Sequence, residues 1–338
     1  MSMARFLTRR LFHSIFVIIG ISMLIFVISR IVPGDPARMA LGDNASQESV
    51  DKLREDMHLN EPIYTQYYYW IRGVLTGNFG FSLTTNRSVS DDVREFLPAT
   101  LEIVIVAGVI QTSMAFVVGL LAARNRDNAV DGAIRMMSYI GVSVPSFVWA
   151  IFFLLFFGFT WQVLPVINRL STGTLPPNRI TGMYIIDFLL MGNFGGAWDA
   201  FQHVFLPGLS LSIAHIFSEG RVLRSSLIDN MSKEYISVAT AYGTPKNKLF
   251  YKYMLKPSAI SMVTMAGLDF ATTLGNAFLV ETIFNWPGLS RYGLTVMMNK
   301  DLNAISIVII IIGLLFMISN IVVDVIIAAL DPRVRLGE

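Results

Sequence analysis

The most informative polar residues of this sequence lie inside long apolar stretches. They are Gln111, Glu219, Asp269 and Asn276. A polar group within a hydrocarbon layer is costly, so such residues usually pair, hydrogen-bond between helices or line a path for a polar solute. These four residues are therefore our candidates for a translocation path. Interhelical hydrogen bonding is the alternative for Gln111, Asp269 and Asn276, and for Glu219 we expect an ion pair with a nearby arginine such as Arg224.

Residue types that would support catalysis or metal binding do not form a recognisable set. The four histidines lack ligand spacing such as HExxH, and there is no cysteine for a disulfide or a thiolate site. The sequence contains no G-x-x-x-x-G-K-[ST] phosphate loop and no Ser-His-Asp pattern. We therefore expect no catalytic residue, no metal site and no cofactor in this chain, and no nucleic-acid partner. If ATP drives the protein, a separate subunit must bind ATP and magnesium.

Composition indicates an all-α membrane protein. Of 338 residues, 54% are hydrophobic and 15% are charged, whereas soluble domains carry about 25% charged residues. The apolar residues form six runs near the roughly 20 residues that cross a hydrocarbon core. The predicted spans cover about 11–31, 99–123, 136–160, 203–220, 258–283 and 302–330. The fourth is the weakest, because it contains a proline, a histidine and a glutamate.

The first apolar run resembles a cleaved signal peptide in one respect, since it follows Arg9 and Arg10. Its apolar stretch exceeds the 7–15 residues of a signal-peptide core, and no small-x-small cleavage site follows it. We therefore expect residues 1–32 to form a retained membrane helix.

The distribution of Lys and Arg predicts the orientation. Basic residues concentrate near the N-terminus, between spans two and three, between spans four and five, and after span six. Short basic loops favour the cytoplasmic side. We expect both termini and the loop 221–257 to face the cytoplasm.

Two long segments would then lie on the outer side. Residues 33–97 begin with a Pro-Gly-Asp-Pro turn, contain a polar helix near 47–57 and continue into the aromatic stretch "YTQYYYWI". Its rings fit either a surface helix packed on the bundle or an aromatic belt at the membrane surface. Residues 161–202 are expected to form a loop or small cap, and residues 98–335 a five-helix core.

The loop between spans four and five has its own helical pattern. We predict one helix from Glu234 to Tyr242 and a left-handed Gly243 at its end. Thr244 would be the N-cap of a second helix, with Pro245 in its first turn. On this second helix, an apolar face would be formed by Leu249, Phe250, Tyr253 and Met254. Two interpretations remain open from physics alone: a docking site for another protein, or an amphipathic loop whose lysines contact anionic lipid.

The pattern Glu-x(4)-Ala-x-Ala-x-Gly in this loop resembles the EAA loop of bacterial ABC importer permeases. Further segments are similar to the dipeptide/oligopeptide/nickel permease subfamily over about residues 5–335: "VPGDPA", "FLPATLEI", "SVPSFVWAI", "VETIFNWPGLSRYG" and "DPRVR". The resemblance implies a six-helix type I importer fold with outer insertions after helices 1 and 3, located in the bacterial inner (plasma) membrane. It also implies transport of di- or oligopeptides, with nickel chelates or oligosaccharides as alternatives. An ion-driven secondary transporter would instead show inverted repeats.

The same resemblance implies partners and site residues. The partners are a second homologous permease subunit, two cytoplasmic ATPase subunits, an extracytoplasmic solute-binding protein and membrane lipid. The loop would couple the permease to the ATPase through Glu234, Tyr235, Ala239, Ala241, Gly243, Thr244 and Pro245. An outer gate, or a surface facing the binding protein, would include Glu281, Trp286, Pro287 and Gly288. A membrane-interface role is the alternative for Trp286.

This chain departs from the family pattern at two places. The family usually has Ile-Pro shortly after the coupling helices, whereas this chain has Ile260-Ser261 and an earlier Pro257. We therefore expect the entry into span five to be shifted. The family also tends to have an apolar residue at the position of Glu219.

Overall fold

The structure is a computed structural model that describes residues 3–31, 37–38, 45–56 and 58–330. The predicted turn at 33–36 and the "DPRVR" segment at 331–335 lie outside these residues. The described chain is almost entirely helical. Its helices and strands are α1 (Met3–Ile31), α3 (Gln47–Asp56), α4 (Ile63–Leu75), β1 (Phe81–Ser82), β2 (Arg87–Ser88), α5 (Val89–Arg124), α6 (Ala129–Ser143), α7 (Ser146–Phe153), the π-helix η1 (Leu154–Thr160), α8 (Tyr184–Leu190), α9 (Phe194–Met231), α10 (Glu234–Ala241), α11 (Lys246–Lys248), the π-helix η2 (Leu249–Leu255), α12 (Lys256–Ile283), α13 (Leu289–Met298) and α14 (Leu302–Leu330).

Several helices are long and apolar enough to cross a membrane. Within the described residues there are five: 12–30, 89–124, 194–231, 246–283 and 302–327. A sixth candidate is the pair α6 and α7–η1, which passes the same test only when its two halves are taken together. The predicted weak fourth span is in fact part of the 38-residue helix α9, which continues through Pro207.

The predicted third span is not one straight helix. α6 and α7–η1 meet at an angle of 104°. Val144 has an extended backbone and is followed by Pro145. A proline has no N–H to donate and disfavours helical geometry in the preceding residue, so the helix is interrupted here. The segment is therefore a sharply bent pair rather than the single straight crossing that we expected.

Helices α5 and α9 form the centre of the bundle and approach very closely. A Cβ atom added to Gly119 of α5 would lie 2.6 Å from the carbonyl oxygen of Gly220 in α9. Nearby, the Ser212 hydroxyl in α9 donates to the carbonyl of Ala107 in α5 at 2.9 Å. Small residues permit this kind of helix contact in membrane proteins.

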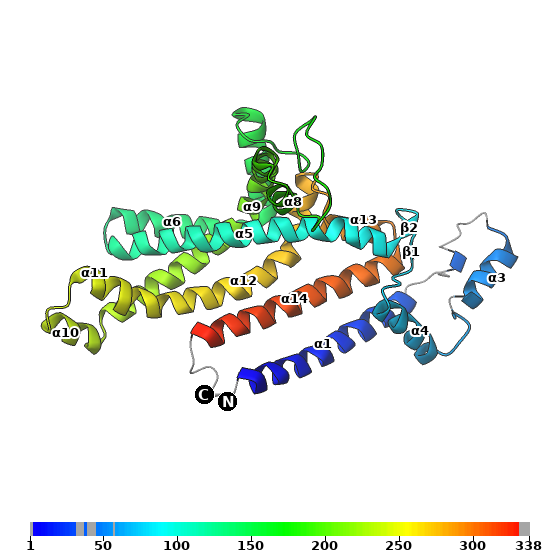
Figure 1. Cartoon of the computed structure of the whole chain (residues 1–338), viewed down its shortest axis with the longest axis horizontal. Helices are drawn as coiled ribbons and strands as arrows, with labels where there is room; N and C mark the ends of the chain where they lie inside the picture. Colours follow the sequence, from blue (N-terminus) through cyan, green and yellow to red (C-terminus); the bar gives the residue numbers. More distant parts are fainter. Residues whose placement is uncertain (1–2, 32–36, 39–44, 57, 331–338) are drawn as a thin grey trace.

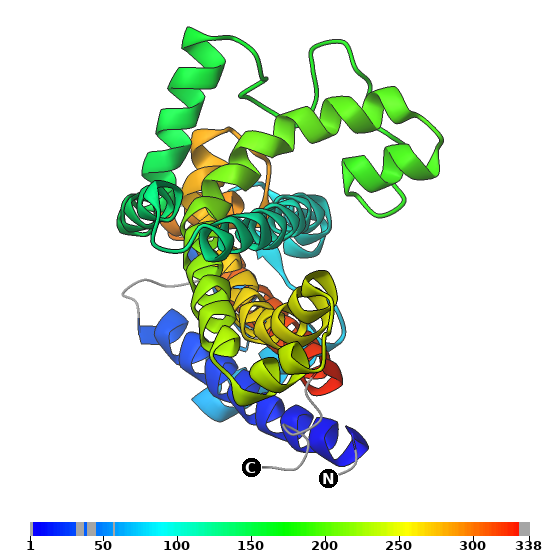
Figure 2. The same ribbon diagram turned by 90° about the vertical axis from the view of Figure 1, so that its left-hand side faces the viewer.

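Two ends of the bundle can be distinguished in Figure 1. We call the end that carries α10 and α11 the loop end, and the opposite end, with β1, β2 and α13, the hairpin end. The first turns of α1 and the last turns of α14 point toward the loop end (Figure 1). In Figure 2 the segment from α7 through α8 to the start of α9 extends away from the rest of the bundle.

Helix α4 is the predicted aromatic segment, and it packs on α1. The Tyr67 hydroxyl lies 2.8 Å from the Ser22 hydroxyl, and the Phe26 ring contacts both Tyr67 and Trp70. Tyr64 and Tyr68 remain exposed. A surface helix packed on the bundle is therefore present.

Candidate functional site

Helix α10 ends as the sequence predicts. Gly243 has a φ angle of +73°, in the left-handed region that glycine adopts at little cost. The N–H of Gly243 donates to Thr240 O at 2.9 Å and that of Thr244 donates to Ala239 O at 3.1 Å. This is the Schellman arrangement, which satisfies the last carbonyl groups of a helix and reverses the chain.

The start of the second helix differs from our expectation. The residue that precedes α11 is Pro245, and no side-chain cap is present there. Thr244 is not the N-cap, because Pro245 after it still has a non-helical backbone, with ψ at 137°. Pro245 accepts the N–H of Leu249 through its carbonyl at 3.0 Å, so the helix begins one residue later than predicted.

The outward face of α10 is apolar and exposed. Ile236 is its buried residue, whereas Tyr235, Val238 and Tyr242 are exposed, Tyr242 to 86%. A large apolar face that the chain itself does not cover is typical of an interaction site. Glu234 and Ala241 are also exposed, and Ala239 is partly covered.

The second helix of the loop is continuous with span five. α11, η2 and α12 together form one helical candidate span over 246–283. Leu249 is buried, and Phe250 and Met254 pack on the adjacent apolar cluster around Leu223, Leu227 and Met262, so the predicted apolar face is turned toward the bundle. The switch from π- to α-helix lies at Pro257, which occupies the first turn of α12.

Three of the four predicted path residues lie at one level of the bundle. The Gln111 side-chain amide in α5 donates to Glu219 Oε1 in α9 at 3.1 Å, and both side chains are buried. Asp269 in α12 faces α9, where its Oδ2 lies 3.3 Å from His215 Nδ1. Asn276 is exposed and does not join this cluster.

This polar cluster has more acceptors than donors. Gln111 Oε1, Glu219 Oε2 and Asp269 Oδ2 are buried and have no hydrogen-bond partner among the described residues. The Asp269–His215 contact is close enough for an ion pair but lacks hydrogen-bond geometry. Unpaired acceptors inside a bundle are costly, so the cluster is suited to receive a hydrogen-bond donor group.

The predicted pair between Glu219 and Arg224 does not form. Arg224 Nε and Nη2 instead donate to the two carboxylate oxygens of Asp131 in α6, each at 2.6 Å. Residues five apart on an α-helix are separated by about 140° around its axis, so Glu219 and Arg224 point to different sides of α9. We call the Asp131–Arg224 pair, in which the carboxylate is buried and the guanidinium is partly exposed, the α6–α9 clasp.

The predicted outer-gate residues form a buried knot at the start of α13. Glu281 accepts the Thr100 hydroxyl at 2.6 Å and the backbone N–H of Arg291 at 2.7 Å. The Trp286 indole donates to Ala99 O at 2.9 Å, and the side chain is only 1% exposed. Trp286 is therefore a core residue and not a membrane-interface anchor.

The knot leaves no space for a side chain at position 288, which explains the glycine there. A Cβ atom at Gly288 would lie 2.4 Å from the Glu281 carboxylate. Pro287 lies between Trp286 and Gly288 and also borders a cavity that is lined in part by Arg169 and Tyr184. The knot holds α12 and α13 against the start of the apolar part of α5.

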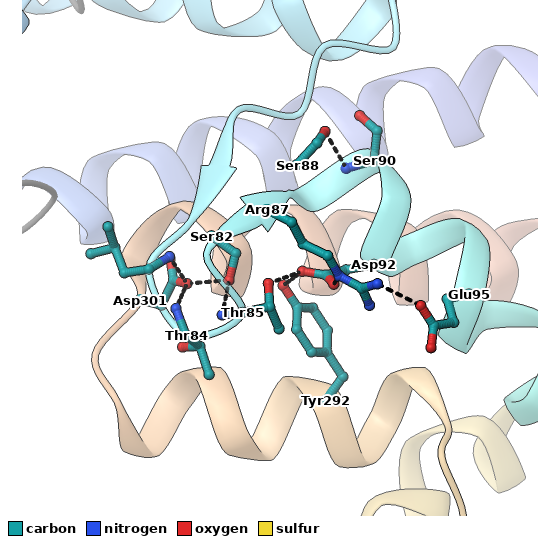
Figure 3. A network of polar contacts seen from close by, with 11 residues as sticks. Ser82, Thr84, Thr85, Arg87, Ser88, Ser90, Asp92, Glu95, Tyr292 and Asp301 are labelled. Atoms are coloured by element: carbon teal, nitrogen blue, oxygen red, sulfur yellow. Dashed lines mark hydrogen bonds and ion pairs between the residues drawn. The ribbon is translucent and has the colours of Figure 1, made fainter.

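The β1–β2 hairpin is bound to the bundle by a second polar network, shown in Figure 3. Asp301 Oδ2 accepts the Ser82 hydroxyl at 2.7 Å and the N–H of Leu83 at 2.8 Å. Asp92 accepts the hydroxyl groups of Thr85 and Tyr292 at 2.6 and 2.7 Å. Both carboxylates are buried.

The electrostatic environment keeps the proton on the Tyr292 hydroxyl, which is a hydrogen-bond donor in this network. Burial raises the pKa of the Tyr292 phenol, and the neighbouring Asp92 carboxylate raises it further. The Tyr292 hydroxyl therefore keeps its proton and donates to Asp92. Arg87 pairs with Asp92 and, at 2.6 Å, with Glu95, which adds a cation beside the buried carboxylate.

Sequence reasoning missed the residues that hold these sites in place. They are Asp92, Asp131, Arg169, Tyr292 and Asp301. Arg169, for example, donates to Glu102 Oε2 at 2.5 Å and lies over the Tyr184 ring, and both charged side chains are buried. For the four charged residues the available signal was their charge outside the apolar runs, but that signal does not identify the partners, and Tyr292 gave no such signal.

Comparison with known proteins places the chain among membrane transport subunits. Residues 115–336 match the family described as binding-protein-dependent transport system inner membrane component, and residues 3–104 match the N-terminal family of such membrane components. The chain is 33% identical to the probable D,D-dipeptide transport system permease protein DdpB of Escherichia coli K12, over 98% of this chain and 97% of that protein.

Two further relatives match over the same extent. The dipeptide transport system permease protein DppB of Alkalihalophilus pseudofirmus is 31% identical over 98% of this chain and all of that protein. The probable peptide ABC transporter permease protein y4tP of Sinorhizobium fredii is 30% identical over 98% of this chain and all of that protein. Together with the apolar helices and the exposed loop helix, these matches mean that the chain belongs to the binding-protein-dependent transport system inner membrane components.

Proposed function

We propose that this chain is a permease subunit of an ATP-driven importer that moves di- or oligopeptides across the inner membrane. The observation that carries the proposal is the near-complete match to permeases named for dipeptide and peptide transport. The match spans the apolar helices, the polar cluster and the loop helix α10, which are the parts that transport requires.

The proposed assembly contains a second homologous permease, two ATPase subunits and an extracytoplasmic binding protein. The ATPase subunits bind ATP and magnesium and hydrolyse ATP, and this chain takes no part in that chemistry. Membership of a binding-protein-dependent transport family supports a binding-protein partner. Helix α1 supports contact with lipid or the second permease, because its side chains Phe12, Phe16 and Leu24 are exposed along an apolar helix.

We further propose a type I importer topology with six spans, counting the bent pair α6 and α7–η1 as one. Residues 1–32, 33–97 and 98–335 are the N-terminal helix, the outer insertion and the permease core, and 161–202 is the outer loop. The termini and residues 221–257 face the cytoplasm. A membrane-impermeant amine reagent should then label Lys246 and Lys248 only after the membrane is opened; labelling from outside intact cells would contradict this orientation.

The proposed mechanism assigns a task to each end of the bundle. At the loop end, α10 docks on the ATPase with its exposed face of Tyr235, Val238 and Tyr242. Its movement reaches the bundle through the continuous helix 246–283, which carries Asp269 of the polar cluster. Gln111, Glu219 and Asp269 line the path when the bundle opens, and the segment Glu281–Gly288 stabilises the outer gate.

The coupling proposal is tested by replacing Gly243 with valine. Valine is strained by about 1–2 kcal/mol in a left-handed conformation, and a side chain here would enter open space beside the docking face. In vesicles holding the complete importer, ATP and a labelled dipeptide, uptake should fall at least about tenfold while the amount of inserted complex is unchanged.

The matched control is Gly132→Val in α6. Gly132 also has open space around its missing side chain, but it lies in a regular helix. This variant should retain uptake close to that of the unmodified protein. Normal uptake by Gly243→Val would remove the support for the coupling role of α10.

A further inference from the structure

One tyrosine hydroxyl connects the loop helix to two helices of the bundle. The Tyr235 hydroxyl, in the first turn of α10, lies 3.0 Å from Asn230 Oδ1 and 3.3 Å from the carbonyl oxygen of Tyr253. Asn230 is in the last turn of α9 and Tyr253 is in η2. Because the hydroxyl has one proton and two acceptors, it has two alternative hydrogen-bonded states.

Pro257 removes one possible backbone donor to the Tyr253 carbonyl. In a regular α-helix this carbonyl would accept the N–H of residue 257, but a proline has none. The neighbouring Ser258 hydroxyl donates to Met254 O at 2.7 Å. Tyr253 O, which cannot accept an N–H from Pro257, accepts the Tyr235 hydroxyl close to the switch from η2 to α12.

Asn230 connects the same point to the beginning of α12. Its side-chain amide donates to Ser226 O at 2.9 Å and to the Ser258 hydroxyl at 2.8 Å. Ser258 is buried, so this contact joins the end of α9 to the start of α12 inside the protein. We name the set Asn230, Tyr235, Tyr253 O and Ser258 the tyrosine node.

Helix α10 has few other attachments to the bundle. Ile236 is its buried side chain, and the turn at Gly243 fixes only its far end. The tyrosine node is therefore the polar contact through which its near end meets both α9 and α12. These helices also carry His215, Glu219 and Asp269 of the polar cluster.

We propose that Tyr235 is a positioning residue whose hydroxyl transmits movement of α10 to α9 and α12 together. When α10 shifts, the hydroxyl exchanges Asn230 Oδ1 for Tyr253 O, and the two helices respond as one unit through the Asn230–Ser258 contact. Such a two-state element is what transmission between distant sites requires. The inference rests on the proposed coupling role of α10 and adds the residue that makes the connection.

The test is Tyr235→Phe in the complete importer, with peptide uptake and ATP hydrolysis measured in the same vesicles. Loss of one hydrogen bond should lower the number of peptides transported per ATP about fivefold. Phenylalanine keeps the ring that Tyr235 presents on the docking face, and the amount of assembled complex is measured in the same samples as this ratio. A purely structural role would lower the amount of complex and leave the ratio of transport to hydrolysis as it was.

The matched control is Tyr251→Phe in the adjacent π-helix. Its hydroxyl accepts a hydrogen bond from Arg124 at 3.2 Å, outside the tyrosine node, so the ratio should stay normal. A ratio in Tyr235→Phe equal to that of the unmodified protein, or an equal fall in Tyr251→Phe, would overturn the proposal.

Asn230→Ala provides a second, independent measurement. Removing Asn230 breaks both the contact with Tyr235 and the contact with Ser258, so its ratio should also fall. The double variant with Tyr235→Phe should be no worse than Asn230→Ala alone, because the two residues act through one connection; additive losses would contradict the node. Loss of uptake in Gly243→Val with a normal ratio in Tyr235→Phe would refute the node alone, whereas normal uptake in Gly243→Val would refute the coupling role itself.

Discussion

The hairpin end and the loop end of the bundle are held together in opposite ways. At the hairpin end, the buried carboxylates of Asp92, Glu281 and Asp301 each accept at least two hydrogen bonds. At the loop end, within the part of the chain that the structure describes, α10 buries Ile236 and hydrogen-bonds to the bundle through the Tyr235 hydroxyl. Dense buried networks give rigidity, whereas sparse exposed contacts permit movement. The difference indicates one fixed end and one adjustable end.

We expect the α6–α9 clasp to form the boundary between the adjustable part of the loop end and the rigid part of the bundle. Asp131→Asn leaves the Arg224 guanidinium without its carboxylate, and we expect a loss of about 3 kcal/mol in the free energy of unfolding. Thermal unfolding of the purified protein in detergent measures this. Asp127→Asn, at an exposed position in the same turn, is the control and should change stability by less than about 0.5 kcal/mol. Equal effects would show that the loop end has no rigid boundary here.

The hairpin network should show the next largest effect. Asp92→Ala removes the acceptor for Thr85 and Tyr292, and two unpaired hydroxyl groups should cost about 2 kcal/mol or more. The neighbouring Asp91 is exposed, so Asp91→Ala should have little effect on stability. This control separates the loss of buried hydrogen bonds from the loss of a negative charge at the start of the helix. If the two variants unfold at the same temperature, the hairpin end is not the fixed end.

A single hydroxyl can be compared between the two ends. Tyr292→Phe should lower the free energy of unfolding by about 1 kcal/mol, because it leaves a buried Asp92 oxygen with one donor fewer. Tyr235→Phe should lower it much less, since Tyr235 is exposed to 44%, although it changes transport. Thermal unfolding of both variants provides the comparison, and a larger loss in Tyr235→Phe would reverse it.

The smallest effect on stability is expected on the docking face. Tyr242→Ala removes a side chain that is 86% exposed, so the unfolding temperature should be almost unchanged. Binding of the ATPase subunit, measured by co-purification, should nevertheless weaken. A destabilised protein with normal ATPase binding would mean that this face packs on the bundle instead.

Local features of the fold could be predicted from sequence because they depend on neighbouring residues. The left-handed Gly243, the apolar face that includes Leu249 and the polar helix near residue 47 follow from short patterns and agree with the structure. The break at Pro145 was also present as a local signal, although we predicted a continuous span. Here the residue before the proline determined the geometry.

Partners far apart in the sequence could not be predicted. Arg224 pairs with Asp131, 93 positions away, and Ser82 with Asp301, 219 positions away. A single sequence indicates that such charges need partners but not which residues provide them. The meeting of Gln111 and Glu219 depends likewise on how closely α5 approaches α9, which is set by Gly119 and Gly220.

The π-helix η2 affects the direction in which α10 points. Each residue of an α-helix turns the chain by about 100° around the axis, and a π-helix accommodates an additional residue without interrupting the helix. Deleting one residue between Leu249 and Leu255 would keep the helix continuous. It would rotate the preceding segment, including α10, about the helix axis by roughly a quarter turn. The direction in which α10 points is therefore set by the residue count of this short stretch, independently of the helix that crosses the membrane.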